Sequence, residues 1–396
     1  MVAPLLTTSP VCRVETFIVT SPRATPYLGP LGPGESVNSR GYVVRRGNGT
    51  IYPTTDRSVV VRVTTKDGSV GWGETYGICA PRATCEIIND LLAPVVIGSD
   101  PENVEDTWDL LYGLMRVRGC SGGFHVDAIA ALDIALWDLR ARMRGVSVAA
   151  LVGTVRHTQI PCYLSGLPAA TLDERVAMAC HWQSAGIESV KFAAVVSHEG
   201  VALEFSALRD ALGPNTDIMV DLHWKYSAQE ALGLAQTLQP LAPRFIEAPV
   251  KPEDSRGLAE VCKNSAVPVA AGEEWYTSYE VQNRLDSCTL AYLQPEMAHT
   301  GITQFCRIAA IAQERGLQIA PHATIGVGIF LAASLQVSST LTNLWKHEWQ
   351  HSVFDGNLAL LNTDMACSNG RYQLPAGPGL GVTPNAHMLA LAQQIT

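Results

Sequence analysis

The chain has 396 residues, of which 47% are hydrophobic and 16% are charged, so it can form a globular protein with a large core. Its net charge of −9 is not offset by any basic cluster, and no apolar run approaches the ~20 residues of a membrane span, which argues against nucleic-acid and membrane partners. Ten scattered cysteines without a CxxC pair are typical of a reducing compartment, so we expect a cytoplasmic protein.

Residues 1 to about 155 predict a separate α+β domain. Strand-like runs come first, at 11–20 and 58–74, and the second contains an Asp67-Gly68 turn that is typical of a hairpin. Helical patterns follow at 85–98, 103–117 and 126–145. The last of them has Ala and Leu on several faces, as expected of a helix buried between domains.

The segment from about 21 to 57 lies between these strands and is rich in glycine and proline, without apolar periodicity. A structureless stretch of this length in a compact protein is usually a lid, a binding loop or a disordered segment. We interpret it as a loop that covers a substrate, with a merely solvated loop as the alternative. Its arginines and tyrosines suit a polyhydroxylated anion, with Tyr27 and Arg45 as the candidates for binding it; the full set is Arg23, Tyr27, Arg40, Tyr42, Arg45, Arg46 and Tyr52.

From 156 to 351 the chain alternates between short apolar runs and amphipathic helical patterns. The runs lie at 160–166, 189–195, 217–223, 243–249, 268–274, 291–296, 318–324 and 343–349. Short apolar runs are typical of buried parallel strands, and no phosphate-binding glycine motif follows any of them. Eight strands with about seven helices predict an α/β fold, a modified (β/α)7β-type TIM barrel. We expect residues 352–396 to pack back on the N-terminal domain and complete it.

Carboxylates end three successive strands at a fixed interval. Asp221, Glu247 and Glu273 follow one another by 26 residues, about the length of one β/α unit. Strand ends converge on one face of such a barrel, and two unit charges 4 Å apart repel by about 4 kcal/mol at an effective dielectric near 20. A divalent cation would resolve this repulsion, and all-oxygen ligands favour Mg²⁺. The alternative is that barrel lysines or arginines pair with the three acids.

Several motifs resemble the enolase superfamily and, within it, the mandelate racemase subgroup. They are ALDIALWDLRAR at 131–142, KFA at 191–193, the three strand-end acids, QPE at 294–296 and PH at 321–322. DLH at 221–223, QPEMAHTGI at 294–302 and APHATIG at 320–326 are similar to the galactonate dehydratase family of acid-sugar dehydratases. The resemblance implies Mg²⁺ bound by the three carboxylates, loss of the proton α to a sugar-acid carboxylate, and loss of the β-hydroxyl as water to give a 2-keto-3-deoxy acid.

Two histidines are candidates for the proton transfers. His322 ends the seventh strand, and Glu296, which ends the sixth, could accept a hydrogen bond from one ring nitrogen and leave the other as the base. The family usually has Asp at the position of Glu296, so the extra methylene leaves the geometry of the pair open. His223 follows Asp221 by two residues, and on a strand both side chains face the same way. We predict that His223 protonates the leaving hydroxyl; a hydrogen bond to a metal ligand is the alternative.

Lys191 ends the second strand, where family members with two bases carry Lys-x-Lys. This chain has Lys191-Phe192-Ala193, so the second base is missing, which favours elimination over racemisation. Lys191 either binds the substrate carboxylate or pairs with a metal ligand. By the resemblance, Glu348 at the eighth strand end hydrogen-bonds the substrate when protonated, with a surface position as the alternative. Trp275 is a candidate for the pocket wall or for the barrel core.

These features predict a Mg²⁺-dependent dehydratase that acts on a small-molecule sugar acid, either an aldonate or an aldarate. The alternatives are a cycloisomerase that opens a sugar-acid lactone or anhydro sugar acid, an epimerase or racemase, and a catalytically inactive barrel that only binds a ligand. The resemblance also implies a homo-oligomer, from dimer to octamer. The sequence does not indicate which sugar acid is bound.

Overall fold

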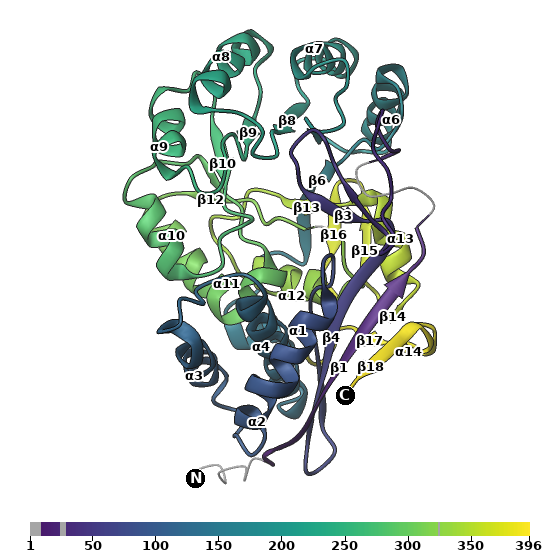
Figure 1. Ribbon diagram of the computed structural model, residues 1–396, viewed down its shortest axis with the longest axis vertical. Coiled ribbons are helices and arrows are strands. Elements are labelled where there is room, and N and C mark those ends of the chain that lie inside the picture. The colour runs from purple at the N-terminus through teal and green to yellow at the C-terminus, as the bar shows by residue number, and fades with distance from the viewer. Residues whose placement is uncertain (1–8, 24–28, 324) are drawn as a thin grey trace.

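The computed structural model describes residues 9–23, 29–323 and 325–396 (Figure 1). Eight parallel strands alternate with helices in its central part. The strands are β6 (Gln159–Ser165), β7 (Ser189–Ala193), β8 (Asp217–Asp221), β9 (Phe245–Glu247), β10 (Val269–Ala271), β11 (Tyr292–Leu293), β12 (Gln318–Ile319) and β13 (His347–Trp349). The helices between them are α6 (Leu172–Ser184), α7 (Val201–Leu212), α8 (Ala228–Leu238), α9 (Ser255–Asn264), α10 (Ser278–Leu285), α11 (Met297–Glu314) and α12 (Ile329–Ser338), with a 3-10 turn η2 (Gln239–Leu241) after α8.

The eight strands close into a ring. Neighbours from β6 to β12 pair in chain order, and β13 pairs with β6. A bridge between Ile319 and Leu344, with the Trp345 N–H donating to the Ile319 carbonyl at 2.8 Å, joins the β12 side to the β13 side. Seven helices separate the eight strands, so the predicted (β/α)7β-type barrel is confirmed.

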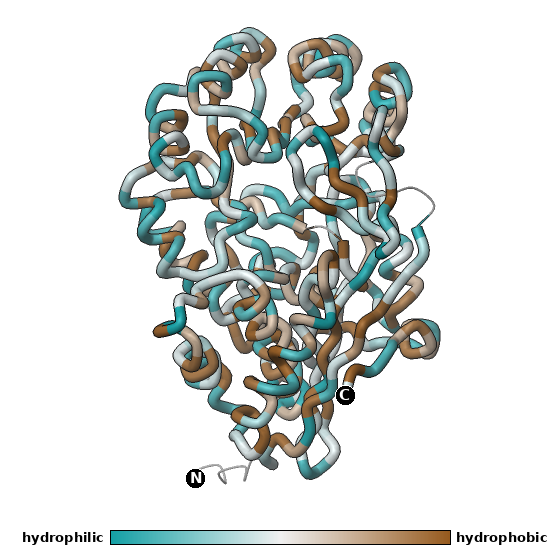
Figure 2. The backbone as a smooth tube through the Cα atoms, in the orientation of Figure 1, coloured by the Kyte–Doolittle hydropathy of each residue, from teal (hydrophilic) through white to brown (hydrophobic). Residues whose placement is uncertain are grey.

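Local sequence signals begin several of the barrel helices. Thr171 and Ser227 each accept a hydrogen bond from the backbone of a glutamate three residues later, and that glutamate bonds back, which forms capping boxes at α6 and α8. Thr277 also caps α10, because its side chain accepts a hydrogen bond from the Glu280 N–H, but no reciprocal bond completes a capping box there. In Figure 2 the barrel helices alternate between hydrophilic and hydrophobic residues, as expected when one face packs on the strands.

A small apolar cluster fills the barrel below the strand ends. Its members share the interior of the ring and are Tyr163, Met219, Phe245, Ala270, Tyr292 and Ala320, with Trp345 packed against them. Stacked side chains from different strands are the usual filling of such a barrel. This cluster gives the polar residues at the strand ends a dry floor.

The N-terminal part forms an antiparallel sheet covered by helices. The sheet has the order β18-β1-β4-β5. Its N-terminal strands are β1 (Val11–Ser21), β4 (Asp56–Thr65) and β5 (Val70–Tyr76), and the helices are α1 (Pro81–Glu86), the π-helical η1 (Ile87–Leu92), α2 (Ala93–Val96), α3 (Val104–Arg116), α4 (Phe124–Met143) and α5 (Val148–Val152). Because 16 of the 20 residues of α4 are buried, this helix lies between the sheet and the barrel as its composition predicts. We call residues 9–152 the cap.

The expectation that residues 21–57 lack structure is wrong in part. Two three-residue strands, β2 (Tyr42–Val44) and β3 (Ile51–Pro53), pair antiparallel within this segment. The connection contains Asn48-Gly49, and Gly49 has a φ of 73°, a conformation that glycine adopts without strain. Strands of three residues are too short to produce a recognisable hydrophobic alternation, which is why the sequence pattern missed them. Tyr27, in contrast, lies outside the described residues.

The C-terminal segment contacts both halves of the molecule. Its elements are α13 (His351–Leu358), β14 (Leu361–Asn362), β15 (Ala366–Ser368), β16 (Arg371–Gln373), β17 (Thr383–Pro384), α14 (Ala386–Leu391) and β18 (Ala392–Ile395). Strand β18 pairs with β1 of the cap, whereas β16 pairs with β6 of the barrel. The segment, yellow in Figure 1, therefore links the cap sheet to the barrel.

Direct hydrogen bonds hold the cap against the barrel. The indole N–H of Trp137 donates to the Thr303 hydroxyl at 3.0 Å, and the Thr303 N–H donates to Asp133 at 2.9 Å. The buried carboxylate of Glu74 accepts from the first two N–H groups of α12, at 2.8 and 3.0 Å. These contacts set the position of every cap residue that reaches the barrel mouth. Among the described residues, no helix is long and apolar enough to cross a membrane.

The close packing of β5 on α4 gives a test of this arrangement. A Cβ added to Gly73 would lie 1.9 Å from the carbonyl oxygen of Ala131, so the strand or the helix must move. We expect Gly73→Ala to lower the free energy of unfolding by about 2 kcal/mol, the usual cost of overpacking. Gly233→Ala, on the exposed side of α8 with open space around it, is the control and should be neutral or stabilising by up to about 1 kcal/mol. Urea unfolding of both variants measures the difference, and an unchanged midpoint for Gly73→Ala would contradict the packing.

Candidate active site at the barrel mouth

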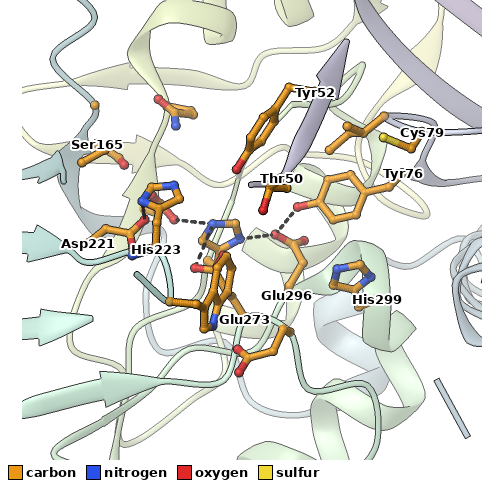
Figure 3. Close-up of a pocket in the computed structure, with 18 of the residues that line it drawn as sticks. Thr50, Tyr52, Tyr76, Cys79, Ser165, Asp221, His223, Glu273, Glu296 and His299 are labelled. Carbon is orange, nitrogen blue, oxygen red and sulfur yellow. Dashed lines mark hydrogen bonds and ion pairs between the residues drawn. The ribbon is translucent and has the colours of Figure 1, made fainter. Parts of the chain in front are cut away.

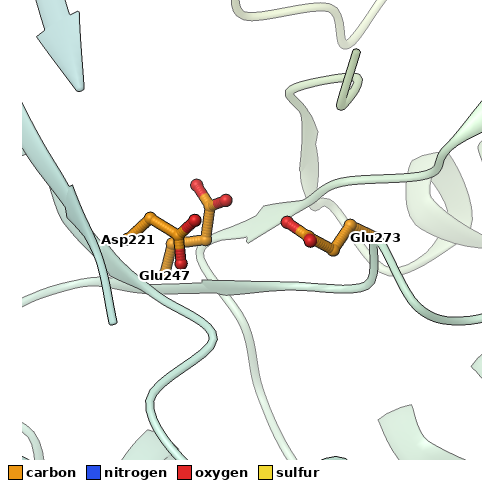
Figure 4. Close-up of side chains that lie close together, drawn as sticks. All are labelled: Asp221, Glu247 and Glu273. Atoms are coloured by element: carbon orange, nitrogen blue, oxygen red, sulfur yellow. The ribbon is translucent and has the colours of Figure 1, made fainter. Parts of the chain in front are cut away.

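The three predicted carboxylates converge at the barrel mouth. Asp221 and Glu247 are the last residues of β8 and β9, and Glu273 follows β10 by two residues. One oxygen of each lies within 4.8 Å of the others (Figure 4). Burial, together with the carboxylates of Asp221 and Glu247, raises the pKa of Glu273 well above its usual value. Its Oε2 is buried and accepts no hydrogen bond from any described residue.

These features fit a divalent cation. A buried carboxylate oxygen without a hydrogen bond is costly, and three neighbouring carboxylates repel one another unless a positive charge lies among them. The donors are all oxygen atoms from carboxylates, the set that Mg²⁺ prefers. Asp221, Glu247 and Glu273 are therefore able to hold Mg²⁺ at this position.

A buried lysine neutralises part of this charge. The Nζ of Lys191 lies 2.7 and 2.9 Å from the two oxygens of Glu247 and 3.0 Å from Oε1 of Glu348. Burial alone would lower the pKa of Lys191, but these two carboxylates raise it well above its usual value. The amide of Gln294 also donates to Glu247, at 2.7 Å. Of the two roles left open for Lys191, the geometry shows the pairing with a candidate metal ligand.

The surroundings of Glu348 favour its carboxylate form. Burial would raise its pKa, but Lys191 and His322 lower it below the usual value. Its Oε2 also accepts from the Ala323 N–H at 2.9 Å. The expectation of a protonated Glu348 that donates to the substrate does not match this environment, because the adjacent ammonium group stabilises the carboxylate.

His322 and Glu296 form a pair despite the extra methylene. The Nδ1 of His322 lies 2.6 Å from Oε2 of Glu296, and the same oxygen accepts from the Tyr76 hydroxyl at 2.8 Å (Figure 3). The other oxygen of Glu296 accepts from the Ala298 N–H at 2.8 Å, so Glu296 also caps α11. These bonds fix a longer side chain in a position that suits the imidazole.

The free nitrogen of His322 faces the acids. Its Nε2 lies 3.4 Å from Glu273 and 3.7 Å from Glu348. Burial lowers the pKa of His322, but Glu273, Glu348 and Glu296 together raise it well above its usual value. A cation among the metal ligands would offset part of this effect, because it neutralises Glu273. The ring nitrogen that could take a proton therefore points toward the candidate metal ligand Glu273.

His223 lies beyond the end of β8, so its direction does not follow from strand alternation. Strand β8 ends at Asp221, and His223 and Trp224 have φ values of 49° and 54°, so the chain turns away in the left-handed region. The His223 N–H donates to Asp221 at 2.8 Å, and its Nδ1 lies 2.8 Å from the other oxygen of that carboxylate. The Nδ1 contact is an ion pair without hydrogen-bond alignment. Burial lowers the pKa of His223, but Asp221 raises it above its usual value, which favours an imidazolium.

A second histidine–carboxylate pair was not predicted. The Nδ1 of His299, on α11, lies 2.6 Å from Asp127, on α4 of the cap. The rings of Tyr76 and Tyr276 pack against His299, with centroids 4.8 and 4.5 Å away. The one available signal was that His299 follows Glu296 by three residues, which places both on the same face of a helix. Asp127 gave no comparable signal, since it joins the site only through packing of the cap.

These groups line one cavity of about 440 Å³. Barrel residues form its floor, and the cap contributes the opposite wall: Thr50, Ile51, Tyr52, Tyr76, Ile78, Cys79, Phe124 and Asp127. In Figure 3, Thr50, Tyr52, Tyr76 and Cys79 lie on the side away from Asp221 and Glu273. Burial, with a smaller effect of the nearby acids, raises the pKa of the Tyr52 hydroxyl to about 12. The β2–β3 hairpin thus contributes Thr50, Ile51 and Tyr52 to the cavity lining, and its role in covering a substrate stays a prediction.

Two residues predicted to contact substrate lie elsewhere. Arg45 donates to Glu35 and to the Pro30 carbonyl, each at 2.9 Å, and to the Gly29 carbonyl at 2.6 Å. Neither Arg45 nor Trp275 is among the described residues that line the cavity. The guanidinium group instead holds the covering loop together, because a buried arginine must satisfy its donors locally.

Trp275 is buried in the core of the barrel domain. Its side chain is fully buried, and its indole N–H donates to Glu274 at 3.0 Å. The Arg284 guanidinium lies 5.2 Å from its ring. Of the two positions considered for Trp275, the core position is the one observed.

Known proteins match this chain along nearly its whole length. Residues 174–388 match the family described as Enolase C-terminal domain-like, and residues 49–153 match the N-terminal domain of the mandelate racemase / muconate lactonizing enzyme family. The D-galactarolactone cycloisomerase of Agrobacterium fabrum is 29% identical over 84% of this chain and 90% of its own length. The D-galactonate dehydratase of Xanthomonas oryzae pv. oryzae is 28% identical over 87% of this chain and 93% of its own.

A crystal structure from Sinorhizobium meliloti, provisionally described as an isomerase, is 51% identical to this chain, with a TM-score of 0.96. The match covers 98% of this chain and 100% of that one. Together with the two family matches, this likeness confirms the resemblance read from the motifs. The chain belongs to the enolase superfamily, with the N-terminal cap and barrel of its mandelate racemase subgroup.

Proposed function

We propose that this protein is a Mg²⁺-dependent dehydratase that converts a sugar acid to a 2-keto-3-deoxy acid. The observation that carries the proposal is the position of the His322–Glu296 pair beside the three-carboxylate cluster. The 28% identity to a D-galactonate dehydratase supports it. When bound, Mg²⁺ would spread the negative charge that a substrate carboxylate gains as its α-proton is lost.

His322 is the base in this proposal. The carboxylate of Glu296 keeps a proton on Nδ1, 2.6 Å away, so that Nε2 carries the lone pair that accepts the α-proton. The Tyr76 hydroxyl and the Ala298 N–H donate to Glu296 and hold its side chain in place. His322 thus supplies the one base that elimination requires.

His223 is the acid in this proposal. The Asp221 carboxylate favours its imidazolium form, and the ring lines the same cavity as His322. A hydroxyl group leaves readily only when it is protonated, so an acid at this point lowers the barrier for loss of water. Lys191 is unsuited to the role of a second base, because two carboxylates within 3.0 Å stabilise its protonated form.

Metal binding can be tested on the protein without any substrate. We expect Mg²⁺ to raise the Tm by a few degrees, because a ligand that binds only the native state adds about 2.7 kcal/mol at 100 times its Kd. Glu273→Gln should lose this shift, since it removes one of the three carboxylates. Glu274→Gln, which changes the neighbouring acid, is the control and should keep it. An equal Mg²⁺ shift in Glu273→Gln and the native protein would sink the assignment of the site.

The base can be tested by proton exchange. We expect His322→Asn to remain folded, to keep its Mg²⁺-dependent Tm shift, and to lose turnover by at least ~100-fold, the usual contribution of a general base. In D₂O, NMR should show no exchange of the substrate α-proton. His198→Asn, at an exposed position outside the cavity, is the matched control and should exchange and turn over normally. Exchange at the native rate in His322→Asn would rule out this base.

A second candidate is a cycloisomerase that opens a sugar-acid lactone. The 29% identity to a D-galactarolactone cycloisomerase favours it, and the Sinorhizobium meliloti structure described as an isomerase is consistent with it. The same abstraction of an α-proton by His322 would start the reaction. The leaving group differs, however, since opening a lactone by β-elimination releases a carboxylate, a weak base that departs without a proton.

This difference makes His223→Asn a discriminating variant. If the reaction is dehydration, we expect the variant to lose keto-acid formation by at least ~100-fold while α-proton exchange continues, because only the acid is missing. Ring opening of a lactone should instead stay within about tenfold of the native rate. NMR of the products in D₂O measures both. Dehydration at the native rate in His223→Asn would remove this residue as the acid.

A further inference from the structure

The cavity contains no positive side chain without an acidic partner. Four cationic or imidazole side chains line it: Lys191, His223, His299 and His322. Each lies within 3.0 Å of at least one carboxylate oxygen, and no arginine is among the described lining residues. The residues outside the described ranges, 1–8, 24–28 and 324, include no lysine, arginine or histidine. Among the described residues that line the cavity, no lysine, arginine or histidine is therefore left without a carboxylate neighbour.

The cap-side wall is neutral or acidic. It presents the apolar side chains of Ile51, Ile78 and Phe124, hydroxyl groups from Thr50 and two tyrosines, and the carboxylate of Asp127. On the barrel side, Glu274 adds a carboxylate whose Oε2 is buried and accepts no hydrogen bond from the described residues. Hydroxyl groups of a ligand could donate to these acids, whereas a carboxylate would be repelled by them.

An extended sugar acid would reach from the barrel side of the cavity to its cap-side wall. Its reacting carboxylate must lie at the cluster of Asp221, Glu247 and Glu273, so the far end of the molecule meets the cap. A second carboxylate there would be buried without a cation beside it, and burial of an unpaired charge is among the most costly changes a binding site can impose. A neutral hydroxymethyl end has no such cost.

We infer that the substrate carries one carboxylate only and that open-chain sugar diacids are excluded. This inference rests on the proposed function. As a statement about the substrate that binds, it admits both candidate reactions, because an aldonate has one carboxylate and the lactone of a diacid has one free carboxylate. The second carboxylate of the lactone forms only in the product, when the ring opens. Of the two substrate classes that the sequence left open, this inference favours the aldonates and excludes the open-chain aldarates.

The inference can be tested with pairs of acids that differ only in oxidation of the terminal carbon. Galactonate, galactarate and galactarolactone form one such set, and other configurations of the same acids complete the panel. At saturating Mg²⁺, we expect kcat/KM for the aldonate or the lactone to exceed that for the matching diacid by at least a hundredfold. Binding to the His322→Asn holoenzyme, measured by calorimetry, should show the same order.

The outcomes separate this inference from the proposed function. Turnover of an open-chain diacid within tenfold of its monoacid would overturn the inference and leave the dehydratase proposal intact. If no sugar acid is turned over and none binds the His322→Asn holoenzyme, the proposed function fails and the substrate class fails with it.

A gain of charge on the cap-side wall gives a second test. The side chain of Thr50 points toward the cavity in Figure 3 and comes from the β2–β3 hairpin rather than from the core. We expect Thr50→Arg to raise kcat/KM for the diacid by at least tenfold relative to Thr50→Gln, the neutral control of similar length. The two variants should differ much less with the monoacid. Equal responses of Thr50→Arg and Thr50→Gln to the diacid would contradict the charge argument.

Discussion

Excess negative charge at the carboxyl ends of the barrel strands is the constraint around which this site is organised. Asp221, Glu247, Glu273 and Glu348 meet above a dry apolar floor, and Lys191 is the one ammonium group among the described residues of the cavity. Lys191 contacts Glu247 and Glu348, whereas Asp221 and Glu273 have, among the described residues, only histidine rings as basic neighbours. The raised pKa of Glu273, and its buried oxygen that accepts no hydrogen bond from the described residues, are local signs of the excess negative charge. A divalent cation removes the imbalance, and the chemistry proposed for the site uses the same charge.

His322 and His223 each lie beside a different carboxylate, and the two surroundings favour different protonation states. His322 is held by Glu296, an acid that also caps α11 and accepts from Tyr76 of the cap. His223 is held by Asp221, a candidate metal ligand. The first arrangement leaves a ring nitrogen directed at the cluster, and the second favours a protonated ring. The same cavity therefore holds the two histidines to which the proposed function assigns the base and the acid of water elimination.

The cap is part of this chemistry rather than only a cover. Hydrogen bonds from Trp137 to Thr303 and from α12 to Glu74 fix the cap on the barrel. This position brings Tyr76 to the catalytic pair and Asp127 to His299. It also places a wall on which the described residues offer no unpaired cation across the cavity from the three carboxylates, so the inferred preference for a single substrate carboxylate depends on residues from both domains.

The sequence by itself determined the barrel, the convergence of the three acids and the His322–Glu296 pair, because a β/α unit has a nearly constant length and each strand end repeats the same local pattern. The same reasoning could not predict the positions of Arg45 and Trp275. Arg45 bonds to neighbours within an irregular loop, and Trp275 is buried beside a strand end, and neither environment leaves a periodic pattern in the sequence. Tyr76 and Asp127 were decided only by the tertiary structure, because they contact residues 220 and 172 positions away, through packing of the cap on the barrel. The direction of His223 was likewise decided by two left-handed residues after β8, which end the strand alternation that sequence reasoning assumed.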